Sequence, residues 1–126
     1  MTTFLIDDDA LGNFLTETLL RMEGFSEQIQ TFESAEEALA QLLARPELPR
    51  VVFLDLHMPG MSGWDFLDAL APHRPRLRGH CRIYILTSSL ALSDMNRSRE
   101  YELVAGLIHK PIDSEEIRAI LAELAT

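Results

Sequence analysis

The chain has 126 residues, the size of one domain, and its 11 basic and 20 acidic residues leave a formal net charge of −9. That charge argues against direct nucleic-acid binding, and no apolar run approaches the roughly 20 residues that span a bilayer. The N-terminus lacks a secretory signal pattern, and the single cysteine, Cys81, excludes an internal disulfide framework and fits a core residue in a reducing cytoplasm.

Strand-like and helix-like segments alternate from the N-terminus. Phe4-Leu5-Ile6 predicts a first strand, and a run at helical spacing follows until Gly24, which we expect to end that helix. The alternating polar and apolar residues of 28–32 predict a half-covered second strand. The expected core face of the first helix is Leu11, Phe14, Leu15, Leu19 and Met22.

The middle of the chain continues the alternation. Ser34 and Glu37 match the S-x-x-E capping box and open a second helix. The wholly apolar segment 51–54 predicts a central parallel strand buried on both faces. A loop rich in Pro and Gly precedes a third helix, whose Trp64 and Phe66 we assign to core packing.

The last third is less regular. Residues 72–79 contain two prolines and three arginines and predict an irregular connection before a fourth strand at 82–86. Ser93 is expected to cap a fourth helix that is nearly all polar and therefore weakly held. A fifth strand at 104–108 precedes a helix capped by Asp113 or Ser114. Five βα units imply an α/β fold, a five-stranded parallel sheet with helices on both faces.

Reactive side chains follow four of these strands. Asp7 and Asp8 follow the first, Asp55 the third, Thr87 the fourth, and Lys110, the only lysine, the fifth. Ligands bind outside the carboxyl ends of parallel strands, so one pocket should hold all five. A Mg²⁺ ion relieves repulsion between the adjacent carboxylates, and Asp55 can then attack phosphorus to form an aspartyl phosphate. Thr87 and Lys110 suit the phosphoryl oxygens.

The whole chain resembles the receiver domains of bacterial two-component response regulators. The resemblance rests on residues 4–9, 55–63 and 86–89 and on Lys110-Pro111, and residues 55–63 match the motif D-x-x-M-P-x-M-x-G. It implies a doubly wound, flavodoxin-like (βα)5 fold with strand order 2-1-3-4-5 and a single receiver domain over residues 1–126. The implied function is phosphoacceptor signalling, in which the domain promotes only its own phosphorylation and dephosphorylation.

The resemblance also implies roles and partners. Asp55 is the phosphorylation site, Asp8 the direct Mg²⁺ ligand, Asp7 its acidic partner, and the main-chain carbonyl of His57 a further ligand. Thr87 and Lys110 contact the phosphoryl group, and the Lys110–Pro111 peptide is expected to be cis. The donor is a histidine kinase, a histidine phosphotransfer domain or a small phosphodonor. An unidentified protein target binds the fourth helix, fifth strand and fifth helix.

Three positions bear on how the domain would work. Leu107 stands where the family often has an aromatic residue that turns inward on activation, so an aromatic switch is in doubt. His57 and Ser89 occupy variable positions that tune phosphoryl lifetime in the family. Whether His57 steers water or is a loop residue without a role stays open.

Two other classes share parts of this pattern. A haloacid-dehalogenase-type phosphohydrolase would use Asp7 as nucleophile, but Leu11 departs from its D-x-D-x-[TV] motif, no strand-borne acidic pair follows Lys110, and Asp55 would have no role. A flavodoxin-like FMN-binding module needs a Ser/Thr/Gly-rich phosphate loop, whereas residues 7–11 are acidic. Turnover of a phosphate ester, or flavin titration, would distinguish these classes.

Overall fold

Five parallel strands form one sheet in the order β2-β1-β3-β4-β5, which confirms the expected topology. The computed structural model describes residues 1–125, and Thr126, the last residue of the expected domain, lies outside them. The strands are β1 (Thr2–Ile6), β2 (Gln28–Phe32), β3 (Val51–Asp55), β4 (Arg82–Thr87) and β5 (Val104–His109).

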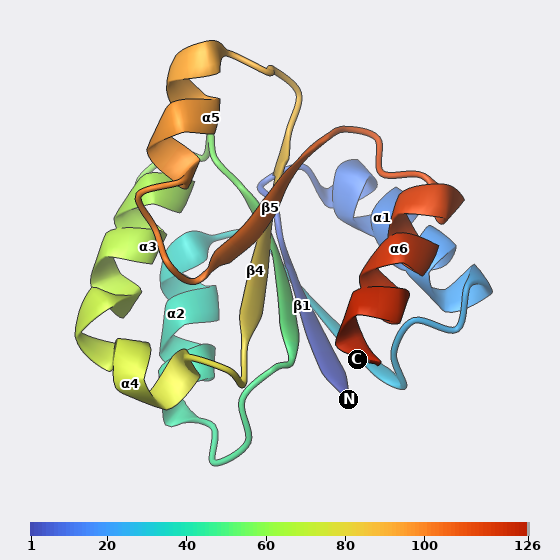
Figure 1. Cartoon of the computed structure of the whole chain (residues 1–126), viewed down its shortest axis with the longest axis horizontal. Helices are drawn as coiled ribbons and strands as arrows, with labels where there is room; N and C mark the ends of the chain where they lie inside the picture. The colour runs from blue at the N-terminus through green and yellow to red at the C-terminus, as the bar shows by residue number, and fades with distance from the viewer. Residues whose placement is uncertain (126) are drawn as a thin grey trace.

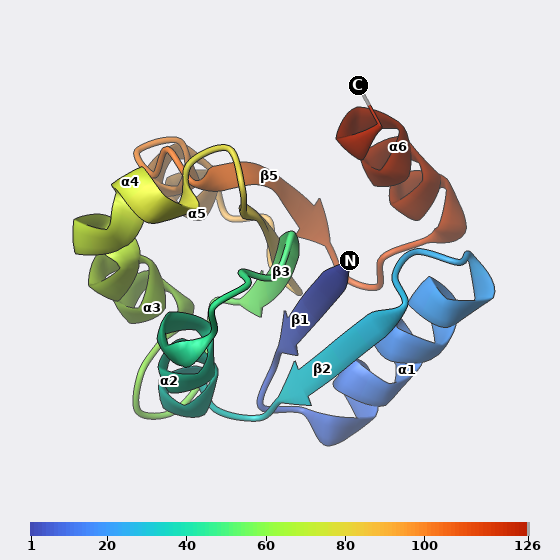
Figure 2. The ribbon, with the colours of Figure 1, turned by 90° about the horizontal axis from the view of Figure 1, so that it is seen from below.

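Helices cover both faces of this sheet (Figures 1 and 2). α1 (Ala10–Met22) and α6 (Ser114–Leu124) lie on one face, and α2 (Ala35–Ala44), α3 (Gly63–Leu70) and α5 (Leu92–Ser98) lie on the other. The connection at 72–79, expected to be irregular, instead forms the short turns η1 (Ala71–His73) and α4 (Arg74–Leu77). Leu77 is fully buried there and gives this segment a reason to fold back.

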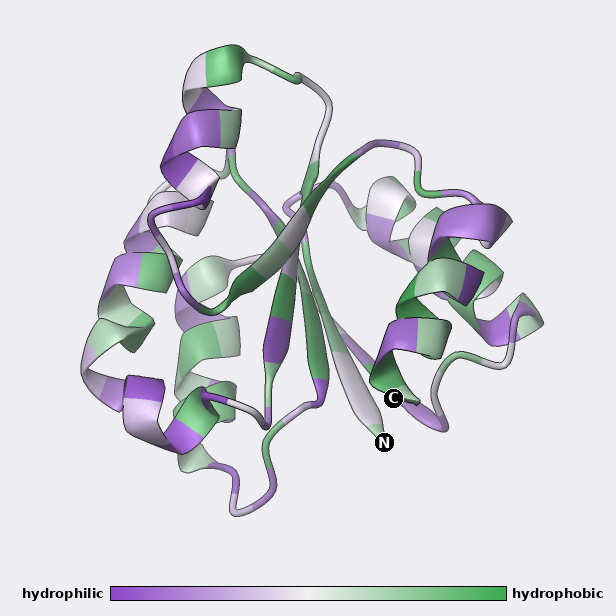
Figure 3. Ribbon diagram, viewed as in Figure 1, coloured by the Kyte–Doolittle hydropathy of each residue, from purple (hydrophilic) through white to green (hydrophobic). Residues whose placement is uncertain are grey.

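The core has two layers, one on each side of the sheet. Alternate strand residues, such as Phe4 and Val52, pack against α2 and α3, whereas Leu5 and Phe53 pack toward α1 and α6. Every residue of β3 is buried, as predicted for a central strand. The strands are accordingly mostly apolar, whereas much of α5 is polar (Figure 3). Trp64 and Phe66 lie in the core, as expected, and so does Cys81.

The helix ends follow the predicted caps with one exception. Ser34 accepts a hydrogen bond from the amide of Glu37, and Asp113 forms a capping box with Glu116 at the start of α6. Gly24 follows α1 with a φ of +64°, a conformation that glycine adopts without strain. The expected Ser93 cap is wrong: the cap is Ala91, two residues earlier, and α5 begins at Leu92, so Ser93 lies inside its first turn.

The orientation of α1 also contradicts the sequence-based expectation. Four of the five residues expected in the core are exposed: Leu11 (64%), Phe14 (63%), Leu15 (59%) and Met22 (75%). We call these four the α1 apolar surface. The helix instead turns Asn13 and Leu20 toward the sheet. Asn13 faces inward because its side-chain amide bonds to main-chain carbonyls there, which a helical period of apolar residues cannot reveal.

Candidate functional site

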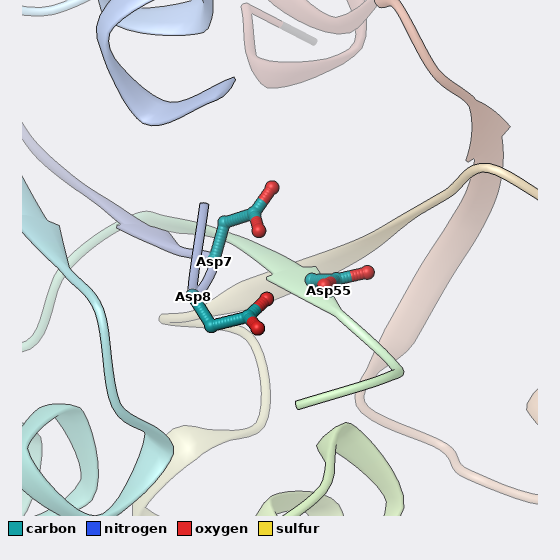
Figure 4. A group of neighbouring side chains, drawn as sticks. All are labelled: Asp7, Asp8 and Asp55. Carbon is teal, nitrogen blue, oxygen red and sulfur yellow. The ribbon is translucent and has the colours of Figure 1, made fainter. Parts of the chain in front are cut away.

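Three carboxylates converge at the carboxyl edge of the sheet (Figure 4). Asp7 and Asp8 follow β1, Asp55 ends β3, and one oxygen from each lies within 4.8 Å of the others. The two strands pair in register as far as Ile6 and Leu54, so the residues that follow must emerge side by side. Asp7 and Asp55 are buried, whereas Asp8 is exposed and accessible.

Lys110 completes this cluster from the end of β5. Its Nζ atom lies 2.6 Å from Oδ2 of Asp7 and 3.5 Å from Oδ1 of Asp55. The Lys110–Pro111 peptide is cis, as expected. Burial by itself lowers the pKa of Lys110, but hydrogen bonding and charge from Asp7 and Asp55 outweigh it, so the pKa lies above its ordinary value. The ammonium is therefore fully charged at neutral pH.

The pKa of Asp55 is raised, chiefly because burial disfavours its anion. Lys110 and the main-chain amide of His57 oppose this shift, and the neighbouring charge of Asp7 adds to it. When ionised, three carboxylates (−3) and one ammonium (+1) leave a net charge of −2 in the pocket. Oxygen donors with this excess charge fit a hard divalent cation such as Mg²⁺.

Thr87 is fully buried at the end of β4 and its hydroxyl is engaged locally. The hydroxyl donates to the carbonyl of Ser89 over 3.0 Å and accepts from the Ser89 amide over 3.1 Å. The amide of Lys110 donates to the Thr87 carbonyl over 2.8 Å, so these two residues occupy adjacent strand ends. The imidazole of His109 also lies 3.2 Å from the carbonyl of Ser88. The loop after β4 is thus held by polar contacts.

Helix α5 is attached to α3 by aromatic and polar contacts. The guanidinium of Arg97 lies 4.6 Å from the ring centroid of Trp64, and the Tyr101 ring stacks on the same indole at 5.7 Å. The Tyr101 hydroxyl donates to Asp68 over 2.7 Å. These contacts explain how a largely polar helix remains docked, and none of them was foreseen from the sequence.

The side chain of His57 lies in the segment that follows β3. It is exposed, and its Nε2 atom lies 3.9 Å from Oδ2 of Asp94 near the start of α5. Leu107, at the position where an aromatic was considered, is half-buried and packs against the core layer that contains Trp64. The side-chain rotation expected of an aromatic at that position is unavailable to Leu107.

Two further residues hold the site: Gly63, the final glycine of the D-x-x-M-P-x-M-x-G motif, and Asn13, which was not identified from the sequence. A Cβ atom on Gly63 would lie 2.5 Å from the Asp55 carbonyl, so only glycine fits where α3 approaches the end of β3. Asn13 donates from Nδ2 to the carbonyls of Asp7 and Phe32. The one available signal for Asn13 was a polar residue within the apolar segment of the first helix.

No helix in the part of the chain that the structure describes is long and apolar enough to cross a membrane.

Comparison with known proteins gives one consistent result. Residues 3–122 match the family model of the response regulator receiver domain. The chain is 29% identical to the sensor histidine kinase AruS of Pseudomonas aeruginosa over 126 residues, which is all of this chain but 12% of that protein. It is 32% identical to sporulation initiation phosphotransferase F of Bacillus subtilis over 117 residues, 90% of this chain and 86% of that protein.

Solved structures agree with the sequence matches. A two-component response regulator from Cytophaga hutchinsonii superposes with a TM-score of 0.89 at 28% identity and covers 98% of this chain and 96% of its own.

Proposed function

The chain belongs to the response regulator receiver domain family, and from that premise we propose that it is a Mg²⁺-dependent phosphoacceptor in a two-component or phosphorelay pathway. Asp55 is the proposed phosphorylation site. The observation that carries the proposal is the cluster itself, in which three carboxylates lie within 4.8 Å of one another and Lys110 contacts two of them. We propose residues 1–126 as a single receiver domain.

The proposed reaction is a direct displacement at phosphorus. A carboxylate oxygen of Asp55 bonds to phosphorus while the bond to the imidazole nitrogen of a phosphohistidine breaks, and the donor imidazole leaves with the electron pair. The Lys110 ammonium, already 3.5 Å from Oδ1 of Asp55, is placed to compensate the charge of the transferred oxygens.

The proposed Mg²⁺ ligands are Asp7, Asp8, Asp55 and the main-chain carbonyl of His57. Bound there, the ion would supply positive charge against the carboxylates and the phosphoryl oxygens. The excess of negative charge in the pocket supports this assignment, and so do its oxygen-only donors.

The geometry favours Asp55 over Asp7 as nucleophile. Oδ2 of Asp7 accepts from Lys110 over 2.6 Å, and its Oδ1 accepts from the Asp9 amide over 3.0 Å. Both oxygens of Asp7 thus accept hydrogen bonds of 3.0 Å or less, whereas the contact of Lys110 with Asp55 is longer, at 3.5 Å. This difference weighs against the phosphohydrolase alternative, in which Asp7 attacks phosphorus.

Thr87 supplies a route from phosphorylation to a change in shape. To donate to a phosphoryl group on Asp55, its hydroxyl must give up the hydrogen bond that it donates to the Ser89 carbonyl. The loop after β4 then loses this tie, and the change can reach α5, which follows the loop and contacts Trp64 through Arg97. This route requires no aromatic side chain at position 107.

A protein donor fits the surface beside the pocket. The α1 apolar surface begins in the first turn of α1, which Asp9 caps, and its members Phe14, Leu15 and Met22 line one side of a cavity of about 270 Å³. Pro111 and Ile112, which follow Lys110, line the other side. A histidine kinase or histidine phosphotransfer domain that reaches Asp55 would cover this surface. Such donors operate in the cytoplasm, which is the location we propose, and the buried free thiol of Cys81 accords with it.

Phosphorylation by a small donor tests the proposal. Incubation with acetyl phosphate or phosphoramidate and Mg²⁺ should add one alkali-labile phosphoryl group at Asp55, located by mass spectrometry after borohydride trapping. Asp55→Asn and a chelated wild-type sample should both remain unlabelled. Labelling that persists in Asp55→Asn, or that maps to Asp7, would transfer the assignment to the phosphohydrolase class.

A further inference from the structure

Asn13 is a buried amide in a helix whose apolar residues are mostly exposed. It is 5% exposed, and Nδ2 donates to the carbonyl of Asp7 over 2.9 Å and to the carbonyl of Phe32 over 3.2 Å. Burial of an amide is unfavourable unless its N–H groups are hydrogen-bonded, and here both bonds go to main-chain atoms at the edge of the site.

These two carbonyls terminate neighbouring strands. β1 and β2 pair in register up to Ile6 and Phe32, and the Asp7 amide adds one more bond to the Phe32 carbonyl. The Asn13 amide then bridges the two strand ends immediately beyond the last main-chain bond. It therefore restrains the peptide that joins Asp7 to Asp8, from which both acidic side chains project.

The neighbouring residues of α1 support the same loop from the same side. A Cβ atom on Gly12 would lie 3.3 Å from Oδ2 of Asp7, and Asp9 caps the helix by accepting from the amide of Leu11. An aliphatic residue at position 13 would give ordinary packing of helix on sheet. The chain places an amide there and leaves Phe14 and Leu15 in solvent, so simple core packing does not explain the choice.

We propose that Asn13 is a positioning residue for the divalent-cation site, where it holds the Asp7–Asp8 peptide so that both carboxylates face Asp55. The inference rests on the proposed function, because the site's cation is Mg²⁺. Partners that orient metal ligands in this way typically change metal affinity about 10- to 100-fold when removed. Asn13 acts through Asp7 and Asp8 and makes no contact with the cation itself.

The test is the Mg²⁺ dissociation constant, measured by isothermal titration calorimetry without any phosphodonor. Asn13→Ala should weaken Mg²⁺ binding about tenfold or more. Leu20→Ala is the matched control, because it also truncates a fully buried side chain of α1, away from the loop. It should lower the melting temperature and leave Mg²⁺ affinity unchanged.

A second variant separates positioning from electrostatics. Asn13→Asp keeps the shape of the side chain but turns a donor into an acceptor opposite two carbonyls. Added negative charge near a cation site should tighten Mg²⁺ binding if charge alone matters, whereas loss of positioning should weaken it. Weaker Mg²⁺ binding by Asn13→Asp supports the inference, and this test remains usable if Asn13→Ala fails to fold.

The outcomes distinguish this inference from the proposed function. If the wild-type chain binds Mg²⁺ and is labelled at Asp55 while Asn13→Asp binds Mg²⁺ as well or better, the positioning role is wrong and the proposed function stands. A wild-type chain that binds no Mg²⁺ overturns both.

Discussion

Substitution of Phe14 by alanine tests the orientation of α1 and its role together. The sequence pattern places this ring in the core, whereas the structure leaves it 63% exposed on the α1 apolar surface. The two descriptions predict very different losses of stability. They also predict different effects on phosphotransfer from a protein donor.

The magnitude follows from the exposed area. A phenylalanine buries roughly 150–250 Å² in a core, so Phe14, which is 63% exposed, has roughly 55–90 Å² at stake. At roughly 25 cal/mol per Å² the loss in the free energy of unfolding is at most about 2.3 kcal/mol, and area bookkeeping of this kind is an upper limit. A core phenylalanine would cost about 3–5 kcal/mol, and the fully buried Leu20 about 2–5 kcal/mol as Leu20→Ala. Urea unfolding followed by circular dichroism measures the loss for Phe14→Ala and for Leu20→Ala.

The functional arm uses two phosphodonors. Labelling of Phe14→Ala by acetyl phosphate should equal that of the wild type, because the pocket is untouched. Phosphotransfer from the kinase or phosphotransfer domain that serves this chain, found by profiling, should slow about tenfold, equivalent to about 1.4 kcal/mol of docking energy. Leu92→Ala, which truncates an exposed residue on α5, is the control. A stability loss of about 3–5 kcal/mol would show that the ring is in the core and refute the orientation described here.

Four other predictions address the core, the site and the switch. Thr3→Val should raise the free energy of unfolding by about 1 kcal/mol, since the Thr3 hydroxyl is the one buried side-chain polar atom without a hydrogen-bond partner among residues 1–125. If urea unfolding shows a lower free energy of unfolding for the variant, the hydroxyl is hydrogen-bonded after all. The pKa of Asp55 is higher in the folded chain than in the unfolded chain. Its contribution to the free energy of unfolding is therefore fully present below the unfolded pKa and is lost as the pH rises through the folded pKa. In the absence of Mg²⁺, Asp55→Asn should therefore raise the melting temperature at pH 7 but not at strongly acidic pH. An equal rise in melting temperature at both pH values would exclude the ionisation of Asp55 as the cause. Lys110→Arg should impair phosphorylation-dependent switching although charge is kept, because the planar guanidinium does not fit a site shaped for an ammonium; normal binding of a phosphorylation-dependent partner would contradict this. Beryllofluoride, an aspartyl-phosphate mimic, should change amide hydrogen exchange mainly within residues 88–102. Leu107→Ala should have a larger effect on the stability of the domain than on this change in exchange. A response confined to α1 or α2 would place the switch elsewhere.

The strands and the composition of the pocket were predictable from the sequence. β3 is a short apolar run that ends in a carboxylate, and β5 is a short run followed directly by the only lysine of the sequence. Parallel strands bring their carboxyl ends to one edge of the sheet. Residues far apart in the chain, such as Asp7 and Lys110, therefore had to meet once the alternation of strands and helices was recognised.

The rotation of α1 and the attachment of α5 depended on tertiary structure. A helical period identifies an apolar stripe, but it does not show whether that stripe faces the sheet or the solvent. On α1 the bonds from Asn13 to two strand-end carbonyls decide the matter, and on α5 the contacts of Arg97 and Tyr101 with Trp64 do. Each of these contacts joins a helix residue to a residue outside that helix, so the partners become identifiable only when the chain has folded.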